Sequence, residues 1–99
     1  MLNITKKEAG DELAVLLEGR LDTNTAPELE EELTRSLDGV KSLVFDLAGL
    51  EYISSAGLRV LLSTLKIMNK QGSMVVRNVP EPIGEIFEVT GFSDILTIE

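Results

Sequence analysis

Short runs of apolar residues, separated by turn-forming residues, mark the strands of the predicted fold. Residues 12–21 are almost continuously apolar and residues 42–47 repeat that pattern, which predicts two buried strands because both runs are too short for a buried helix. Residues 1–6 alternate loosely, and the turn at Gly10 and Asp11 lets them pair with the following strand as an antiparallel edge. Two further short strands are expected at residues 74–76 and 95–98.

Three other segments place apolar residues at helical spacing. The first begins at Thr25-Ala26-Pro27-Glu28, which has the spacing of a capping box, and ends before Gly39. The second ends at Gly72 and carries apolar residues at i, i+3, i+4, i+7 and i+10, namely Leu58, Leu61, Leu62, Leu65 and Met68. The third covers residues 82–90, before Gly91.

The order of these elements, β-β-α-β-α-β-α-β, predicts a single α/β domain over residues 1–99. Such an alternation packs helices on a mostly parallel sheet through right-handed crossovers, here with an antiparallel N-terminal edge strand. Binding sites on such sheets tend to lie beyond the carboxyl ends of the parallel strands. Two loops, residues 21–25 and 48–57, are expected at that rim.

Charge disfavours two classes of partner. The chain has 99 residues, with 9 basic and 17 acidic side chains and a net charge of −8. A nucleic-acid-binding protein needs the opposite balance, and an anionic membrane surface would repel this chain. Arg59 and Lys66 interrupt the longest apolar stretch, and residues 1–10 lack a secretory signal, so we expect a cytoplasmic protein that does not insert into membranes.

The absence of cysteine and histidine removes most catalytic chemistry. Thiol nucleophiles, thiolate metal sites and imidazole bases are all missing, and no motif announces a carboxylate pair or a Ser–Lys site. We therefore expect no enzyme, no catalytic residue, no metal site and no cofactor. The acidic run at residues 28–32 is interpreted as a solvated helix face, on which Glu31 pairs with Arg35.

The segment that precedes the second helix carries the candidate chemistry. Ser54 and Ser55 are adjacent hydroxyls at the start of that helix, where either could act as its N-cap. A hydroxyl at a helix N-terminus can also carry a phosphoryl group without disrupting the fold. Gly57 would allow either a close approach by a partner or tight packing of the helix on a strand, and the sequence leaves both interpretations open.

This segment resembles the phosphorylation segment of anti-sigma factor antagonists, the small bacterial regulators with a STAS domain. The resemblance covers nearly the whole chain: Ser55, Gly57 and Leu58, Gly19-Arg20-Leu21-Asp22, Thr25-Ala26, Val44-Phe45-Asp46-Leu47 and Gly91-Phe92. It implies that an anti-sigma factor with serine kinase activity binds the unmodified protein and releases its sigma factor. ATP-dependent phosphorylation of one serine then abolishes binding, and a phosphatase resets the switch.

The resemblance also assigns roles to single residues. The phosphoacceptor falls on Ser55, and Ser54, the second candidate, stands where the family commonly has Asp. The implied partner surface consists of Asp22, Thr23, Asn24, Thr25, Ser54, Ser55, Ala56, Gly57, Leu58 and Arg59. The alternative for residues 22–25 is turn and cap chemistry alone. Arg59 would face either solvent or an acidic patch on the partner.

Asp46, at the predicted end of a buried strand, invites comparison with aspartyl-phosphate receivers. Receivers need further carboxylates after the first strand and a lysine on a later strand. Here Asp22 stands alone and Arg77 follows the later strand, so Asp46 is interpreted as a structural carboxylate that fixes a loop.

Two alternative functions remain beside the switch. The first keeps the fold and makes the chain a STAS subunit or scaffold of a transport or sensory complex, with binding that ignores phosphorylation. The second is a small nucleotide-binding protein or enzyme that uses the rim carboxylates, which the absence of a glycine-rich phosphate loop and of a G-x-S-x-G elbow disfavours. We expect a monomer or a weak dimer.

Overall fold

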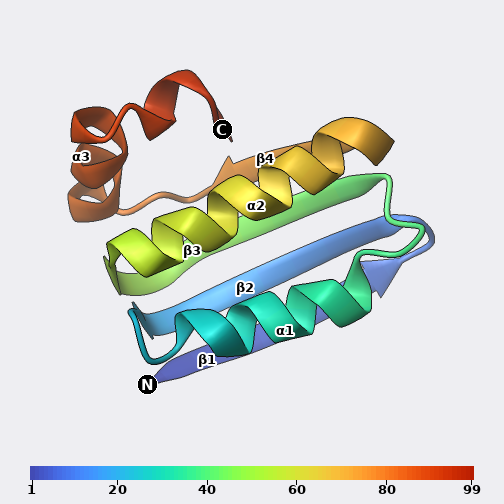
Figure 1. The fold of residues 1–99 in the computed structure, drawn as a ribbon, viewed down its shortest axis with the longest axis horizontal. Coiled ribbons are helices and arrows are strands. Elements are labelled where there is room, and N and C mark those ends of the chain that lie inside the picture. The colour runs from blue at the N-terminus through green and yellow to red at the C-terminus, as the bar shows by residue number, and fades with distance from the viewer.

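The computed structural model describes all residues, 1–99, as a five-stranded sheet in the order β1-β2-β3-β4-β5 (Figure 1). Strand β1 runs antiparallel to β2, and the remaining neighbours are parallel, which confirms the predicted mixed sheet. The strands are β1 (Leu2–Ala9), β2 (Glu12–Leu21), β3 (Ser42–Ile53), β4 (Ser73–Arg77) and β5 (Thr97–Ile98).

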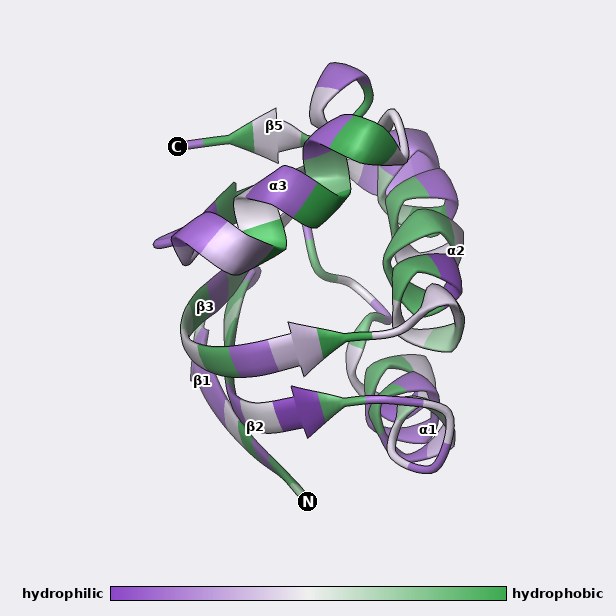
Figure 2. Cartoon of the chain, turned by 90° about the vertical axis from the view of Figure 1, so that its left-hand side faces the viewer, coloured by the Kyte–Doolittle hydropathy of each residue, from purple (hydrophilic) through white to green (hydrophobic).

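Two of the three helices cover one face of this sheet. Helices α1 (Ala26–Ser36) and α2 (Ser55–Gln71) lie side by side on it, as Figures 1 and 2 both show. Helix α3 (Glu81–Val89) lies beyond the end of β4 and is followed by a 3-10 turn, Phe92–Asp94. The single core therefore lies between the sheet and the helices; alternate residues of β2, Leu13, Val15 and Leu17, point into it, whereas Leu47, Leu50 and Ile53 of the irregular part of β3 enter it at a spacing of three.

The apolar face of α2 is rotated from the predicted one. Leu58, Leu61 and Met68 are buried as expected, but Leu62 and Leu65 are only half-buried. Val60 and Thr64 are buried in their place, because α1 packs along that side of α2.

Strand β3 is longer than predicted and absorbs most of the expected loop at residues 48–57. Its second half pairs with the end of β2, with Arg20 opposite Tyr52 and Leu21 opposite Ile53. The register shifts twice, between Leu16 and Glu18 and between Gly19 and Arg20 of β2, and each shift accommodates one extra residue in β3. At the other end of the chain the expected strand 95–98 shrinks to β5, because the 3-10 turn occupies the residues before it.

Asp46 lies inside β3 and not at its end. One carboxylate oxygen accepts a hydrogen bond from the Ala48 N–H at 3.0 Å, and the other accepts one from the Asn78 side chain at 3.1 Å. Asn78 has a positive φ of 55° in the loop after β4. The interpretation of Asp46 as a carboxylate that fixes a loop agrees with these contacts.

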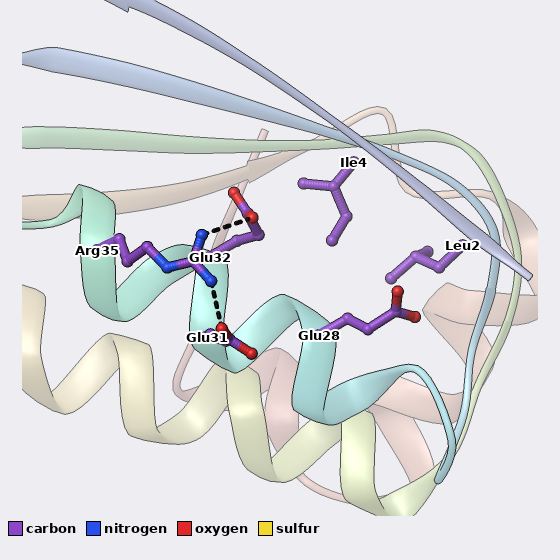
Figure 3. Close-up of a pocket in the computed structure, with 6 residues that line it drawn as sticks. All are labelled: Leu2, Ile4, Glu28, Glu31, Glu32 and Arg35. Atoms are coloured by element: carbon purple, nitrogen blue, oxygen red, sulfur yellow. Dashed lines mark hydrogen bonds and ion pairs between the residues drawn. The ribbon is translucent and has the colours of Figure 1, made fainter.

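The largest cavity, about 330 Å³, lies between β1 and α1 and shares no residue with the candidate site (Figure 3). Leu2 and Ile4 line it on one side and the acidic run of α1 on the other. Arg35 pairs with both Glu31 and Glu32, and Glu32 also pairs with Lys6 at 2.8 Å. The run is therefore an ion-paired, partly solvated helix face.

Candidate protein-binding site

The two predicted rim segments meet where β2 and β3 end. Leu21 and Ile53 are register partners, and the Ser54 N–H donates a hydrogen bond to the Leu21 carbonyl at 2.9 Å. Figure 2 shows the two connections running next to each other into the starts of α1 and α2. We call residues 22–25 and 54–59 together the rim surface.

The first segment is held by a closed set of short hydrogen bonds. One oxygen of Asp22 accepts from the N–H groups of Asn24 and Thr25, at 2.9 and 3.0 Å. The Thr25 hydroxyl accepts from the Asp22 N–H and donates to the Arg20 carbonyl, both at 2.8 Å. The predicted capping box is therefore wrong: the Thr25 side chain fixes the loop and makes no cap contact with the helix.

This loop keeps Asp22 ionised. The hydrogen bond from the Thr25 N–H is the main cause that holds the pKa of the Asp22 carboxyl below its ordinary value. Desolvation opposes it as the second-largest effect, and the Asn24 N–H lowers the pKa further. The Arg20 guanidinium lies 3.9 Å from the other Asp22 oxygen and 4.3 Å from the centre of the Tyr52 ring. The rim surface thus carries an ionised Asp22 carboxylate that is paired with the Arg20 guanidinium.

The geometry at the start of α2 separates the two serines. Ser54 is the N-cap, with extended backbone, and its Oγ accepts a hydrogen bond from the Gly57 N–H at 3.3 Å. Ser55 is the first residue of the helix, and its side chain is exposed. The Ser55 hydroxyl takes part in none of the side-chain hydrogen bonds of the structure, so it is the more accessible hydroxyl of the pair.

Gly57 serves packing. A Cβ at this position would lie 2.7 Å from Cγ of Leu21 and 2.9 Å from Cγ1 of Ile53, closer than carbon atoms approach. The missing side chain lets the first turn of α2 rest on the ends of β2 and β3. This packing fixes the position of Ser55 relative to the sheet.

Some residues of the predicted partner surface are buried and others are accessible to a partner. Thr25, Gly57 and Leu58 are buried inside the domain, so they position the rim surface and offer no side chain to a partner. The members that remain accessible are Thr23, Asn24, Ser55 and Arg59, which are exposed, and Asp22, Ser54 and Ala56, which are half-buried.

One feature of the site has no signal in the sequence. A cleft of about 180 Å³ opens between the starts of α1 and α2, and its lining includes Ala26 and Glu30 from one helix and Ala56 and Arg59 from the other. The two helices are far apart in the chain, and only their packing brings these residues together.

Two further features concern metal binding and membrane insertion. No group of three or more acidic side chains is placed to hold a metal ion. None of the helices combines the length and the apolar character needed to cross a bilayer.

Comparison with known proteins identifies the family. The model of the STAS domain matches residues 3–99, and the chain belongs to this family. It is 34% identical to the anti-sigma-B factor antagonist of Staphylococcus aureus, over 98% of this chain and 92% of that protein.

Solved structures share the fold at lower identity. An anti-sigma factor antagonist from Mycobacterium paratuberculosis superposes with a TM-score of 0.88 at 23% identity, over 99% of this chain and 85% of that one. The Bacillus anti-sigma factor antagonist SpoIIAA matches 98% of this chain in two forms. The TM-score is 0.78 for the unphosphorylated form (12% identity, 87% of that chain) and 0.77 for the phosphorylated form (13%, 91%).

Proposed function

We propose that this protein is an anti-sigma factor antagonist that works as a phosphorylation-controlled binding switch. The unmodified form binds an anti-sigma factor with serine kinase activity, which then releases its sigma factor. Phosphorylation of Ser55 abolishes this binding, and a phosphatase restores it. Family membership and the Staphylococcus aureus relative support the general role.

The exposed, unbonded hydroxyl of Ser55 is the observation that carries the proposal. In the transfer step, its oxygen forms a bond to the γ-phosphorus of ATP as the bond to the bridging oxygen breaks. ADP leaves, and a base of the kinase takes the hydroxyl proton. Ser54 is the poorer acceptor, since its half-buried oxygen already caps the helix.

A phosphate on Ser55 fits the fold and changes the surface. It adds about 1.5 to 2 negative charges at the first position of a helix, where the macrodipole favours them. Asp22 already supplies a negative charge to the same rim. A partner that docks on a neutral hydroxyl is therefore excluded locally, with no change of fold.

The accessible members of the rim surface supply the partner contacts in this proposal: Asp22, Thr23, Asn24, Ser54, Ser55, Ala56 and Arg59. Thr25, Gly57 and Leu58 hold these residues in place. The protein acts in the cytoplasm as a monomer or weak dimer, as a substrate of the kinase, with no catalytic activity or cofactor of its own.

The test is phosphosite mapping by mass spectrometry after incubation with ATP and the serine-kinase anti-sigma factor of the host. We expect one phosphoryl group on Ser55 in wild type and in Ser54→Ala, and none in Ser55→Ala. Ser73→Ala, an exposed serine at the start of β4, is the matched control and should be modified like wild type. Phosphate on Ser54, or on no serine, contradicts the proposal.

A second candidate keeps the fold but not the switch. Ser54 stands where the family commonly has Asp, which favours a STAS scaffold of a transport or sensory complex that is never phosphorylated. For that function, Ser55→Asp would bind its partner as tightly as wild type. For the switch, the same substitution weakens binding.

A further inference from the structure

The cleft between α1 and α2 opens directly beside the phosphoacceptor segment. Its buried members, Ala26 and Val60, together with half-buried Ala56, form an apolar floor. Glu30 and Arg59 are its charged, exposed members, one from each helix. At about 180 Å³, the cleft has room for one branched aliphatic side chain.

The cleft continues along the seam between the helices. A second cavity of about 170 Å³ shares Glu30 and Val60 with it and extends to Leu37 and Ile67. Ile67 is a large hydrophobic residue that is 45% exposed. With a helical rise of 1.5 Å per residue, the seam offers roughly 16 Å of continuous contact from Ala56 to Ile67, enough for about three turns of a partner helix.

Arg59 is an unpaired cation at the mouth of this groove. Neither Arg59 nor Glu30 takes part in any ion pair of the structure. A guanidinium binds carboxylates and phosphates through two parallel hydrogen bonds, so these two anions are its preferred ligands. In a chain with a net charge of −8, an uncommitted arginine at an apolar cleft favours an acidic contact on the partner.

Arg59 also lies within reach of Ser55. Residues four apart on a helix are neighbours, with Cβ atoms about 5–6 Å apart, and an anion that precedes a cation is the favourable order. A phosphate on Ser55 and the Arg59 guanidinium meet this condition on α2.

We propose that Arg59 reads the phosphorylation state of Ser55, an inference that rests on the proposed function. In the unmodified protein, the guanidinium binds a carboxylate of the anti-sigma factor, whose adjoining aliphatic side chain enters the cleft. In the phosphorylated protein, the same guanidinium binds the Ser55 phosphate. The partner's carboxylate then loses its cation and faces a dianion, so the two states exclude each other.

The intramolecular contact is tested without any partner. Protein with phosphoserine encoded at position 55 is titrated by ³¹P NMR, as wild type, as Arg59→Gln and as Lys66→Gln, a control that removes an exposed charge farther along α2. We expect the phosphate pKa, about 6 in the absence of a partner, to be about half a unit higher in Arg59→Gln than in wild type and unchanged in Lys66→Gln. Equal values for Arg59→Gln and wild type overturn the contact.

The partner contact is tested by calorimetric titration of the unmodified protein with the host's serine-kinase anti-sigma factor. Arg59→Gln should weaken binding about tenfold or more, the size expected for one lost charged hydrogen bond. Ala56→Leu, which fills the cleft, should weaken binding to a similar extent and leave the phosphate pKa of the encoded phosphoprotein at its wild-type value. Lys66→Gln should change neither the affinity nor the phosphate pKa.

The outcomes separate this inference from the function on which it rests. Wild-type affinity in Arg59→Gln and Ala56→Leu overturns the docking surface and leaves the switch standing. If unmodified wild type binds no anti-sigma factor while Arg59→Gln still raises the phosphate pKa, the proposed function is overturned and the phosphate contact is supported.

Discussion

Gly57→Ala tests the packing that fixes the height of Ser55. The added methyl group would lie 2.7 Å from Leu21 and 2.9 Å from Ile53, both of which are buried at the ends of parallel strands. Neither branched side chain can turn away without displacing its own neighbours, so the start of α2 must move outward. Overpacking of this kind costs about 1–3 kcal/mol, and the better helix propensity of alanine returns up to about 1 kcal/mol.

We therefore expect a net loss of up to about 2 kcal/mol in the free energy of unfolding. For a domain of this size, a loss of about 2 kcal/mol corresponds to a fall of roughly 8–16 °C in the melting temperature. Urea unfolding followed by circular dichroism measures the loss directly, because the denaturation midpoint falls while the slope stays constant.

Gly84→Ala is the matched control. Gly84 lies inside α3, and a Cβ there would meet only Val79, at an ordinary 3.8 Å. The same substitution should then be neutral or stabilising by up to about 1 kcal/mol. A Gly57→Ala protein as stable as Gly84→Ala would refute the close packing of α2 on β2 and β3.

Three further predictions concern single side chains near the rim and the seam. Ser54→Ala should lower the free energy of unfolding by about 0.5–2 kcal/mol, because the helix loses its N-cap, whereas Ser55→Ala should lower it by less than about 0.5 kcal/mol. Urea unfolding measures both, and equal losses would contradict the assignment of the cap to Ser54. The pKa of Asp22 is lower in the folded protein than in the unfolded chain, so the ionised carboxylate stabilises the folded state. This stabilisation is fully present above the unfolded-state pKa of about 3.9 and is lost as the pH falls through the folded-state pKa. Asp22→Asn should therefore be less stable than wild type at neutral pH, and the difference in unfolding free energy should shrink as the pH falls below the unfolded-state value of about 3.9. A difference that does not depend on pH would contradict this prediction. The Gln71 side-chain amide donates hydrogen bonds to the carbonyls of Leu37 and Val40, both at 2.7 Å. Gln71→Leu should therefore lower the free energy of unfolding by about 1–3 kcal/mol. An unchanged urea midpoint would contradict this prediction and show that water replaces the amide.

The sequence predicted what depends on local periodicity. The order of the elements and the antiparallel first strand follow from apolar spacing and a glycine turn, and both are confirmed. The end of β3 was missed because residues 48–52 lack a continuous apolar pattern. Their strand conformation comes from pairing with β2, a contact between segments distant in sequence.

For the candidate site, too, the sequence predicted what depends on local pattern and missed what depends on contacts between distant segments. The motif residues lie at the ends of β2 and β3, where the sequence predicts them, but two adjacent serines cannot be distinguished by spacing. The helix geometry assigns the cap to Ser54 and leaves Ser55 exposed. The cleft beside Arg59 depends on the packing of α1 against α2, and the role of the Thr25 hydroxyl depends on the loop conformation; neither has a local pattern.

The affinity of the host's serine-kinase anti-sigma factor for the two forms of this protein tests the central claim most directly. Calorimetry with unmodified protein and with protein carrying phosphoserine at position 55 gives both dissociation constants. Like charges brought together at an interface cost several kcal/mol, so phosphorylation should weaken binding by about 100-fold or more. Equal affinity for the two forms would contradict the switch.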